Sequence, residues 1–128
     1  MAEELPRPTG AELEILTVLW SRGPTTVREV HEAICARKPA QYTTVLKTLQ
    51  IMAEKGLVRR DEKQRAHIYR AAQTRERTQR QLAGDLLERA FDGSASSLLL
   101  GALSARKASK EELSELHRLL EEYEKEKL

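Results

Sequence analysis

The stretch QYTTVLKTLQIMAEKGLVRRDEKQRAHIY, from Gln41 to Tyr69, contains the pattern that decides the fold. At about 100° per residue, the segment Gln41–Gly56 separates its side chains into an apolar and a polar side of one helix. The apolar side holds Val45, Thr48, Leu49, Met52 and Ala53, and the polar side holds Thr43, Lys47, Gln50 and Glu54, with Ile51 at its edge. We therefore expect a helix that buries one side and leaves the other free to contact a partner.

A basic hairpin is predicted directly after this helix. Leu57 and Val58 begin an extended run, Glu62–Arg65 forms its turn, and Ala66–Tyr69 forms the returning strand. Between residues 41 and 70, basic side chains outnumber acidic ones by seven to three: Lys47, Lys55, Arg59, Arg60, Lys63, Arg65 and Arg70 against Glu54, Asp61 and Glu62. A half-polar helix followed by a cationic two-stranded hairpin is typical of a winged helix-turn-helix, a fold that reads duplex DNA.

Three S/T-x-x-E capping boxes predict where other helices begin: Thr9 with Glu12, Thr26 with Glu29, and Ser109 with Glu112. The first predicted helix, about Gly10–Ser21, ends before Gly23, and the second, Val27–Arg37, ends before Pro39. The link from the second helix to the helix at Gln41 is short. It forces a sharp turn, as helix-turn-helix geometry requires.

The last part of the chain is predicted to form leucine-rich helices, at about Thr74–Phe91, around Leu98–Leu103 and at about Lys110–Lys125. So many leucines on short helices are hard to bury within one small subunit, so we expect them to pair two copies of the chain. The alternative is that they pack back on their own subunit. The residues expected at the dimer contact are Leu82, Leu86, Phe91, Leu98, Leu99, Leu103, Leu113, Leu116 and Leu120.

Composition limits the class of protein. The chain has 128 residues, of which 40% are hydrophobic and 33% charged, which fits one small domain with an oligomerisation element. No run approaches the roughly 18 apolar residues of a membrane span, and the N-terminal MAEELPRPTG does not resemble a signal peptide. The single cysteine, Cys35, excludes a disulfide framework and a cysteine-based zinc finger. We expect a cytoplasmic protein with no membrane contact, no metal and no cofactor.

Together these patterns predict a mainly α protein with a small β wing. Residues 1–72 are expected to form a winged helix-turn-helix DNA-binding domain, and residues 73–128 a C-terminal helical dimerisation arm. Charge follows the same division, because the segment 41–70 is basic whereas Glu111–Lys127 has seven glutamates against three basic residues. A polyanion is therefore expected to contact the first domain and not the second.

The expected DNA contacts follow from the chemistry of the helix and the wing. Thr43 and Thr44 lie near the helix start, where hydroxyls and unbonded backbone N–H groups hold a phosphate, although simple capping is the alternative role. Lys47 is placed to donate to guanine, Gln50 to pair with adenine, and Ile51 to contact a thymine methyl. The wing residues expected to contact phosphate or the minor groove are Arg59, Arg60, Lys63 and Arg65. The alternative is that this basic run is only a solvated face.

The segments AELEILTVLWSRGPTTVREVHEAI, YTTVLKTLQIMAEKGLVRR and RAHIYR resemble the penicillinase repressor family. The resemblance is strong over about Thr9–Ala72 and weak beyond it. It implies a homodimeric transcriptional repressor with an N-terminal winged helix and a C-terminal helical dimerisation arm. Its partner would be a pseudo-palindromic operator in double-stranded DNA.

Two departures from the family pattern concern function. Lys47 stands where relatives usually have a small hydroxyl residue, and Ile51 where they usually have a basic one, so the base-contacting side of the helix differs. Antibiotic-responsive members are induced by proteolysis at an Asn-Phe bond in the arm, so the resemblance also implies an inducing protease. Gly101-Ala102 occupies the aligned position here, which argues against the same cleavage.

Two other functions are weighed beside the repressor. A winged helix also serves as a protein-interaction module, but Lys47 and the arginine-rich wing speak against that role. A ligand-sensing or metal-sensing regulator is the second, since His31 and Cys35 have metal-ligand spacing on one helix, although two ligands do not make a site. An enzyme is not predicted, because we find no nucleophile with a base, no phosphate loop and no cluster of carboxylates with histidine.

Overall fold

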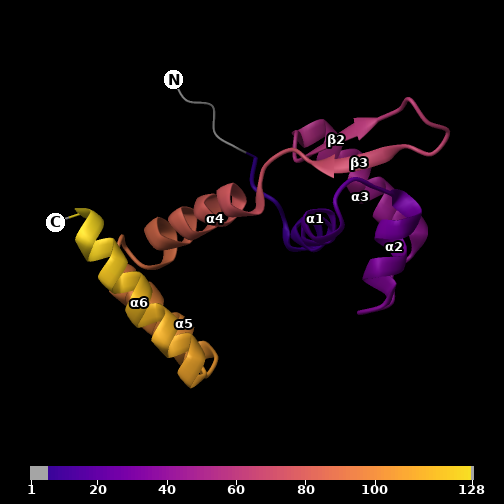
Figure 1. Cartoon of the computed structure of the whole chain (residues 1–128). Helices are drawn as coiled ribbons and strands as arrows, with labels where there is room; N and C mark the ends of the chain where they lie inside the picture. The colour runs from indigo at the N-terminus through magenta and orange to yellow at the C-terminus, as the bar shows by residue number, and fades with distance from the viewer. Residues whose placement is uncertain (1–5, 128) are drawn as a thin grey trace. The chain divides into compact units, whose positions relative to one another are not determined.

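The computed structural model describes residues 6–127 and divides into two compact units, one up to Ala83 and one from Gly84 onward. The boundary between the units falls inside the fourth helix. The elements (Figure 1) are α1 Gly10–Arg22, β1 Thr25–Thr26, α2 Val27–Cys35, α3 Tyr42–Lys55, β2 Val58–Asp61, β3 Ile68–Ala71, α4 Arg75–Ala90, α5 Ala95–Ala105 and α6 Lys110–Lys127.

The core of the first unit lies between α1, α2, α3 and the strands. Its members are Ile15, Leu16, Leu19, Val27, Val30, Ile34, Val45, Leu49, Met52, Leu57, Val58 and Tyr69. Val45, Leu49 and Met52 come from the predicted apolar side of α3, and Leu49 and Met52 have no exposed surface. The amphipathic helix predicted from the sequence is therefore confirmed, and its polar side faces outward.

The capping boxes are confirmed only in part. At Thr9 both halves are present: its hydroxyl accepts from the Glu12 backbone N–H at 3.2 Å, and the Glu12 carboxylate accepts from the Thr9 N–H at 2.8 Å. At Thr26 the hydroxyl accepts from the Glu29 N–H but also donates to the Glu29 carboxylate, which replaces the predicted return bond to the backbone. Ser109 accepts from the Glu112 N–H at 3.1 Å.

The sheet differs from the predicted two-stranded hairpin. It has three antiparallel strands in the order β1-β3-β2, because Thr25 pairs with Tyr69 and Thr26 with Ile68. The returning strand begins at Ile68 and not at the predicted Ala66, so the turn at the tip is longer than Glu62–Arg65. A strand of two residues has no periodic pattern of its own, and its place in the sheet depends on pairing with a distant segment.

A left-handed cap joins α3 to the wing. Gly56 has φ +85°, and the N–H of Leu57 donates to the carbonyl of Met52 at 2.9 Å, which completes a Schellman motif. Leu57 and Val58 then enter the core, and the Ala72 N–H donates to the Leu57 carbonyl at 2.9 Å at the base of the hairpin. The chain therefore passes from α3 to the wing with little conformational freedom.

Trp20 joins the end of α1 to the start of α4. Its indole N–H donates to the carbonyl of Gln73 at 3.0 Å, and the Arg75 guanidinium lies 5.9 Å from the ring centroid. Arg75 also donates to the Ser21 hydroxyl at 3.4 Å. These contacts hold the start of α4 against the end of α1, and they agree with the packing of Trp20 against the core.

The second unit has a different character, since none of its described residues is buried. Leu100, Leu113, Leu119, Leu120 and Tyr123 are all more than a third exposed, and Leu120 retains 53% of its surface. Within residues 6–127 no helix combines the length and the apolar content needed to span a bilayer.

Candidate nucleic-acid interface

The outer side of α3 carries the residues that the sequence pattern predicts as DNA contacts. Thr43, Thr44, Lys47 and Gln50 are exposed, and Ile51 keeps 38% of its surface. Because Val45, Leu49 and Met52 hold the opposite side in the core, these residues cannot turn inward without unfolding α3. The helix thus presents one ammonium, one carboxamide and one apolar side chain to solvent on a fixed support.

The start of α3 has no side-chain cap. Its N-cap residue is Gln41, whose side chain makes no capping hydrogen bond, and Thr43 and Thr44 are the second and third helical residues. Neither threonine is therefore the cap of this helix. The backbone N–H groups of the first turn keep their partial positive charge and face outward without a side-chain acceptor, which suits an anion such as phosphate.

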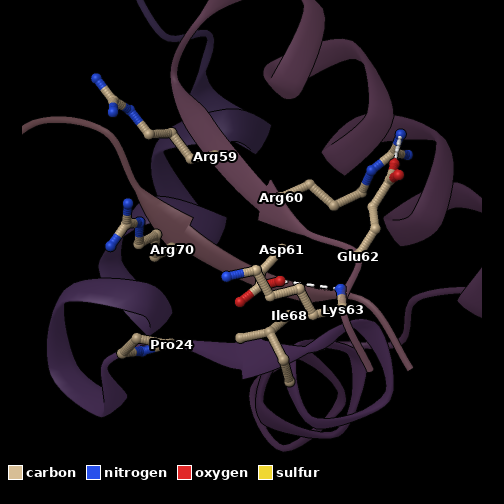
Figure 2. A pocket seen from close by; sticks show the side chains of 8 residues that line it. All are labelled: Pro24, Arg59, Arg60, Asp61, Glu62, Lys63, Ile68 and Arg70. Atoms are coloured by element: carbon tan, nitrogen blue, oxygen red, sulfur yellow. Dashed lines mark hydrogen bonds and ion pairs between the residues drawn. The ribbon is translucent and has the colours of Figure 1, made fainter. Parts of the chain in front are cut away.

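The wing has two faces because side chains alternate along its strands. On the inner face Val58 and Tyr69 are buried, and Arg60 lies directly opposite Tyr69. On the outer face Arg59 lies opposite Arg70, and Asp61 lies opposite Ile68. The predicted wing residues are thus not equivalent, since Arg59 and Arg60 point to opposite sides of the hairpin (Figure 2).

Arg60 is held by partners within the chain. It forms an ion pair with Glu62, which is also visible in Figure 2. A side-chain hydrogen bond with Tyr69, together with the charge of Glu62, raises the pKa of Arg60 further above its ordinary value. This arginine is therefore oriented before any partner binds, and its guanidinium has fewer donors left for phosphate than that of Arg59.

A groove of about 460 Å³ separates α3 from the inner face of the wing. Arg28, Tyr42, Gln50, Arg60, Arg65 and His67 are among the residues that line it. The structure therefore brings Gln50 of the predicted helix set together with Arg60 and Arg65 of the predicted wing set. Arg28, Tyr42 and His67 were not among the predicted DNA contacts, because only the packing of α2 and the wing against α3 places them here.

A second, larger groove of about 830 Å³ lies along the outer face of the wing and extends to Arg60 and Glu62, which also line it. Figure 2 shows its lining, with Arg59 and Arg70 extending from neighbouring strands and Ile68 below Asp61. Lys63 belongs to this groove, and its backbone N–H donates to the Asp61 carboxylate at 2.9 Å. Arg59 and Lys63 therefore lie on the side of the hairpin that does not face α3, and Arg70 was missing from the predicted set.

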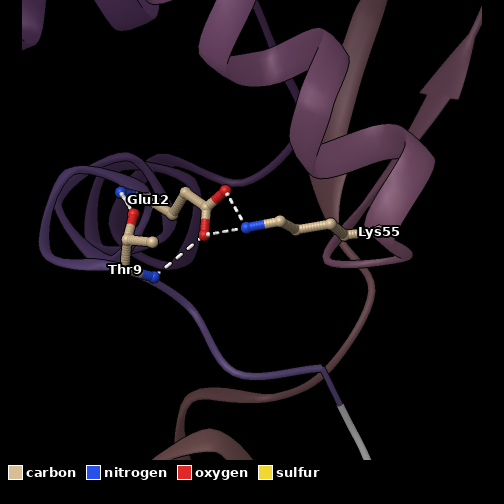
Figure 3. A network of polar contacts seen from close by, with 3 residues as sticks. All are labelled: Thr9, Glu12 and Lys55. Carbon is tan, nitrogen blue, oxygen red and sulfur yellow. Dashed lines mark hydrogen bonds and ion pairs between the residues drawn. The ribbon is translucent and has the colours of Figure 1, made fainter.

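The C-terminal end of α3 is held by a partly buried ion pair (Figure 3). The Lys55 ammonium lies 2.9 and 3.1 Å from the two carboxylate oxygens of Glu12, and Glu12 is only 3% exposed. Glu12 is also the acceptor for the Thr9 N–H, so one carboxylate both caps α1 and binds the last residue of α3. The sequence pattern identifies Glu12 only as a capping residue, because its contact with Lys55 joins residues 43 positions apart.

His31 and Cys35 contact each other and the turn between α2 and α3. The Cys35 Sγ atom lies 3.2 Å from His31 Nε2, and each is within hydrogen-bond distance of the Ala40 carbonyl, at 3.4 and 2.8 Å. The ring of His31 also meets that of Tyr42 edge to face at 5.6 Å. Throughout the described part of the chain, no three His, Cys, Asp or Glu residues gather in a way that would hold a metal ion. The contacts with the Ala40 carbonyl link the end of α2 to the turn before α3.

Comparison with known proteins identifies the relatives of this chain. The family model described as penicillinase repressor matches residues 8–122. The transcriptional regulator BlaI of Mycobacterium tuberculosis is 37% identical over 122 residues, which is 94% of this chain and 88% of that regulator. The penicillinase repressor of Bacillus licheniformis is 24% identical over 125 residues, or 98% of both chains.

The fold is also found among solved structures. The solution structure of the DNA-binding domain of the repressor BlaI superposes with a TM-score of 0.51 at 20% identity. The match covers 58% of this chain and 90% of that domain. The winged-helix fold predicted from the sequence is therefore confirmed.

Proposed function

Because the chain belongs to the penicillinase repressor family, we propose that it is a transcriptional repressor that binds an operator in duplex DNA as a homodimer. Members of this family regulate transcription and are not enzymes. The observation that carries the proposal is the exposed polar side of α3, held rigidly beside a basic wing.

The recognition helix enters the major groove in this proposal. Lys47 donates to guanine O6 and N7, Gln50 pairs with adenine N6 and N7, and Ile51 packs on a thymine methyl. The uncapped first turn of α3, with the hydroxyls of Thr43 and Thr44, binds a backbone phosphate and sets the depth at which the helix lies.

The inner face of the wing follows the same duplex. Arg65 lines the groove next to Gln50 and is free to contact a phosphate or the minor groove, whereas Arg60 acts as an oriented charge beside it. Lys63 contacts the DNA backbone from the outer face of the wing, near the tip of the hairpin. If about four basic groups per subunit neutralise phosphates, the log–log salt slope of the dimer is roughly −7.

The homodimer is proposed from the second unit. A unit in which no described residue is buried gains little from folding alone, so its leucines need a partner surface. The predicted contacts in this unit are half-buried or exposed, among them Leu86 at 47% and Leu113 at 41%. We propose that residues 1–72 bind DNA and residues 73–128 pair the subunits, with α4 as the connection between the two functions.

The proposal also concerns where the repressor acts in the cell and how it is induced. A repressor of this kind acts in the cytoplasm, where its operator lies. We do not extend the family's Asn-Phe cleavage to this chain, because Gly101 and Ala102 lie in the interior of α5. A Cβ atom at Gly101 would lie 3.2 Å from the Phe91 ring, and the bond lies within a hydrogen-bonded helix and not in an exposed loop, where proteolytic cleavage is concentrated.

The experiment that tests the function is a binding selection. The purified full chain is used to enrich sequences from a random duplex library, and the affinity for the selected duplex is measured by fluorescence anisotropy over a range of salt. We expect one enriched sequence with two-fold symmetry and a steep loss of affinity with salt. Absence of any retained duplex at about 50 mM salt would overturn the proposal.

A further inference from the structure

The outer face of the wing carries a pair of like charges in direct opposition. Arg59 on β2 and Arg70 on β3 are cross-strand partners, and both side chains are exposed. Like charges placed directly opposite each other destabilise a sheet. The Arg59–Arg70 pair therefore lowers the stability of the sheet unless an anion binds to it.

No such partner comes from within the described chain. Over residues 6–127, neither Arg59 nor Arg70 takes part in an ion pair or side-chain hydrogen bond, in contrast to Arg60, which binds Glu62. Asp61 lies on the same face, with Ile68 as its cross-strand partner, and its carboxylate accepts from the Lys63 backbone N–H, whereas Glu62 is paired with Arg60. The two guanidinium groups keep their donors for an external anion.

The surroundings of the pair suit an extended anion and not a small enclosed one. The groove on this face is open and has a volume of about 830 Å³. Four basic side chains line it, Arg59, Arg60, Lys63 and Arg70, against the two acidic ones of Asp61 and Glu62. Figure 2 shows Arg59 and Arg70 at one end of the face, with the Lys63 ammonium further along it. Charges spaced along an open sheet surface match the repeated phosphates of a nucleic-acid strand.

We propose that this outer face, with Arg59 and Arg70 as its centre, is a second phosphate-binding site that holds DNA flanking the operator half-site. The proposal rests on the function proposed above. Since the hairpin lies between this face and α3, the two arginines do not reach the base pairs that α3 reads. They contact the backbone on the far side of the wing and add affinity without adding sequence preference.

The test compares two duplexes, one trimmed to the selected operator and one with flanks of about one helical turn on each side. The wild-type chain is compared with an Arg59→Thr/Arg70→Thr variant, in which threonine keeps the preference for a strand. An Arg106→Ala/Lys107→Ala variant removes the same charge from the segment between α5 and α6 and serves as the control. Anisotropy gives the affinities, and hydroxyl-radical footprinting gives the protected sugars.

We expect the wild type and the control to bind the extended duplex about tenfold more tightly than the trimmed one at about 0.1 M salt. The Arg59→Thr/Arg70→Thr variant should bind both duplexes equally, match the wild type on the trimmed duplex, and lose protection only at the outermost sugars. A wild type that binds both duplexes with the same affinity overturns this site but leaves the repressor function intact. If the Arg59→Thr/Arg70→Thr variant loses affinity for both duplexes by the same factor, the second phosphate site is also overturned. A wild-type chain that binds neither duplex overturns the repressor function itself.

Discussion

The ammonium of Lys55, the last residue of α3, lies 2.9 Å from a carboxylate oxygen of Glu12 in the first turn of α1. The two side chains differ in exposure, with 4% of the Glu12 side chain and 39% of the Lys55 side chain open to solvent. The carboxylate therefore depends on its protein partners, whereas the ammonium is still partly hydrated. This asymmetry determines what happens when either residue is replaced.

Replacing Lys55 is expected to cost more than replacing Glu12. Lys55→Met leaves a buried carboxylate without its cation, and we expect the free energy of unfolding to fall by about 3 kcal/mol. Glu12→Gln keeps an acceptor for the Thr9 N–H and lets the lysine turn to water, so the loss should be about 1 kcal/mol. Urea unfolding of both variants measures the difference, and equal losses would contradict the asymmetry.

The contribution of Glu12 should also depend on pH. Burial by itself raises the pKa of Glu12, but the hydrogen bond from the Thr9 backbone and the interactions with Lys55 outweigh it, so the pKa lies below its ordinary value. A carboxyl group with a lowered pKa stabilises the fold above its unfolded pKa and loses that effect as the pH falls through the folded pKa.

The stability difference between wild type and Glu12→Gln should therefore be constant near neutral pH and shrink below about pH 4.3. Urea titrations at a series of pH values test this, with Glu14→Gln as the control, because Glu14 pairs with Lys38 on the surface. A difference that grows on acidification would show that the sign is wrong.

Substitution of Gly56 is expected to lower stability because of the backbone conformation of this residue and not because of steric crowding. Its φ of +85° is unfavourable for a side chain, although a Cβ atom at this position would meet no neighbouring atom within 4 Å. We expect Gly56→Ala to lower the free energy of unfolding by about 1 kcal/mol. Gly10→Ala, which is equally uncrowded and has no positive φ, is the control; a similar loss in both variants would refute the explanation.

The parts of this fold that can be predicted from the sequence are those determined by residues close together in the chain. The polar side of α3 and the cationic hairpin follow from periodicity and charge over short windows, and both are present. β1 escaped prediction because Thr25 and Thr26 become a strand only by pairing with Tyr69 and Ile68. The number of basic residues in the wing could be read from the sequence, but not the face of the hairpin on which each one lies. That depends on the cross-strand register, which pairs Arg59 with Arg70 and Arg60 with Tyr69.

Lys47 is the residue for which the proposed base contact is most specific. Lys47→Ala should lower the affinity for the selected operator by about 1–3 kcal/mol and leave binding to unrelated duplex nearly unchanged. Lys107→Ala removes the same charge from the link between α5 and α6 and should alter neither. If Lys47→Ala weakens binding to all duplexes equally, its contact is with phosphate and not with a base.

The exposed stripe of α6 gives the sharpest test of dimerisation. Leu113 and Leu120 lie two helical turns apart on one side of α6, at 41% and 53% exposure. Replacing both with arginine places charge where the proposed partner packs, so sedimentation should show a monomer. Since two linked recognition helices bind far more tightly than one, operator affinity should fall at least about a hundredfold.

A variant with Ser114→Arg and Glu121→Gln changes the net charge by the same amount at positions of α6 that lie away from this stripe. It should remain a dimer and bind the operator as the wild type does, which separates the effect of the apolar stripe from that of charge. Removing residues 109–128 should have the same effect as the leucine replacements. If the Leu113→Arg/Leu120→Arg protein still sediments as a dimer, the subunits pair through another surface, and α6 is not the element that joins them.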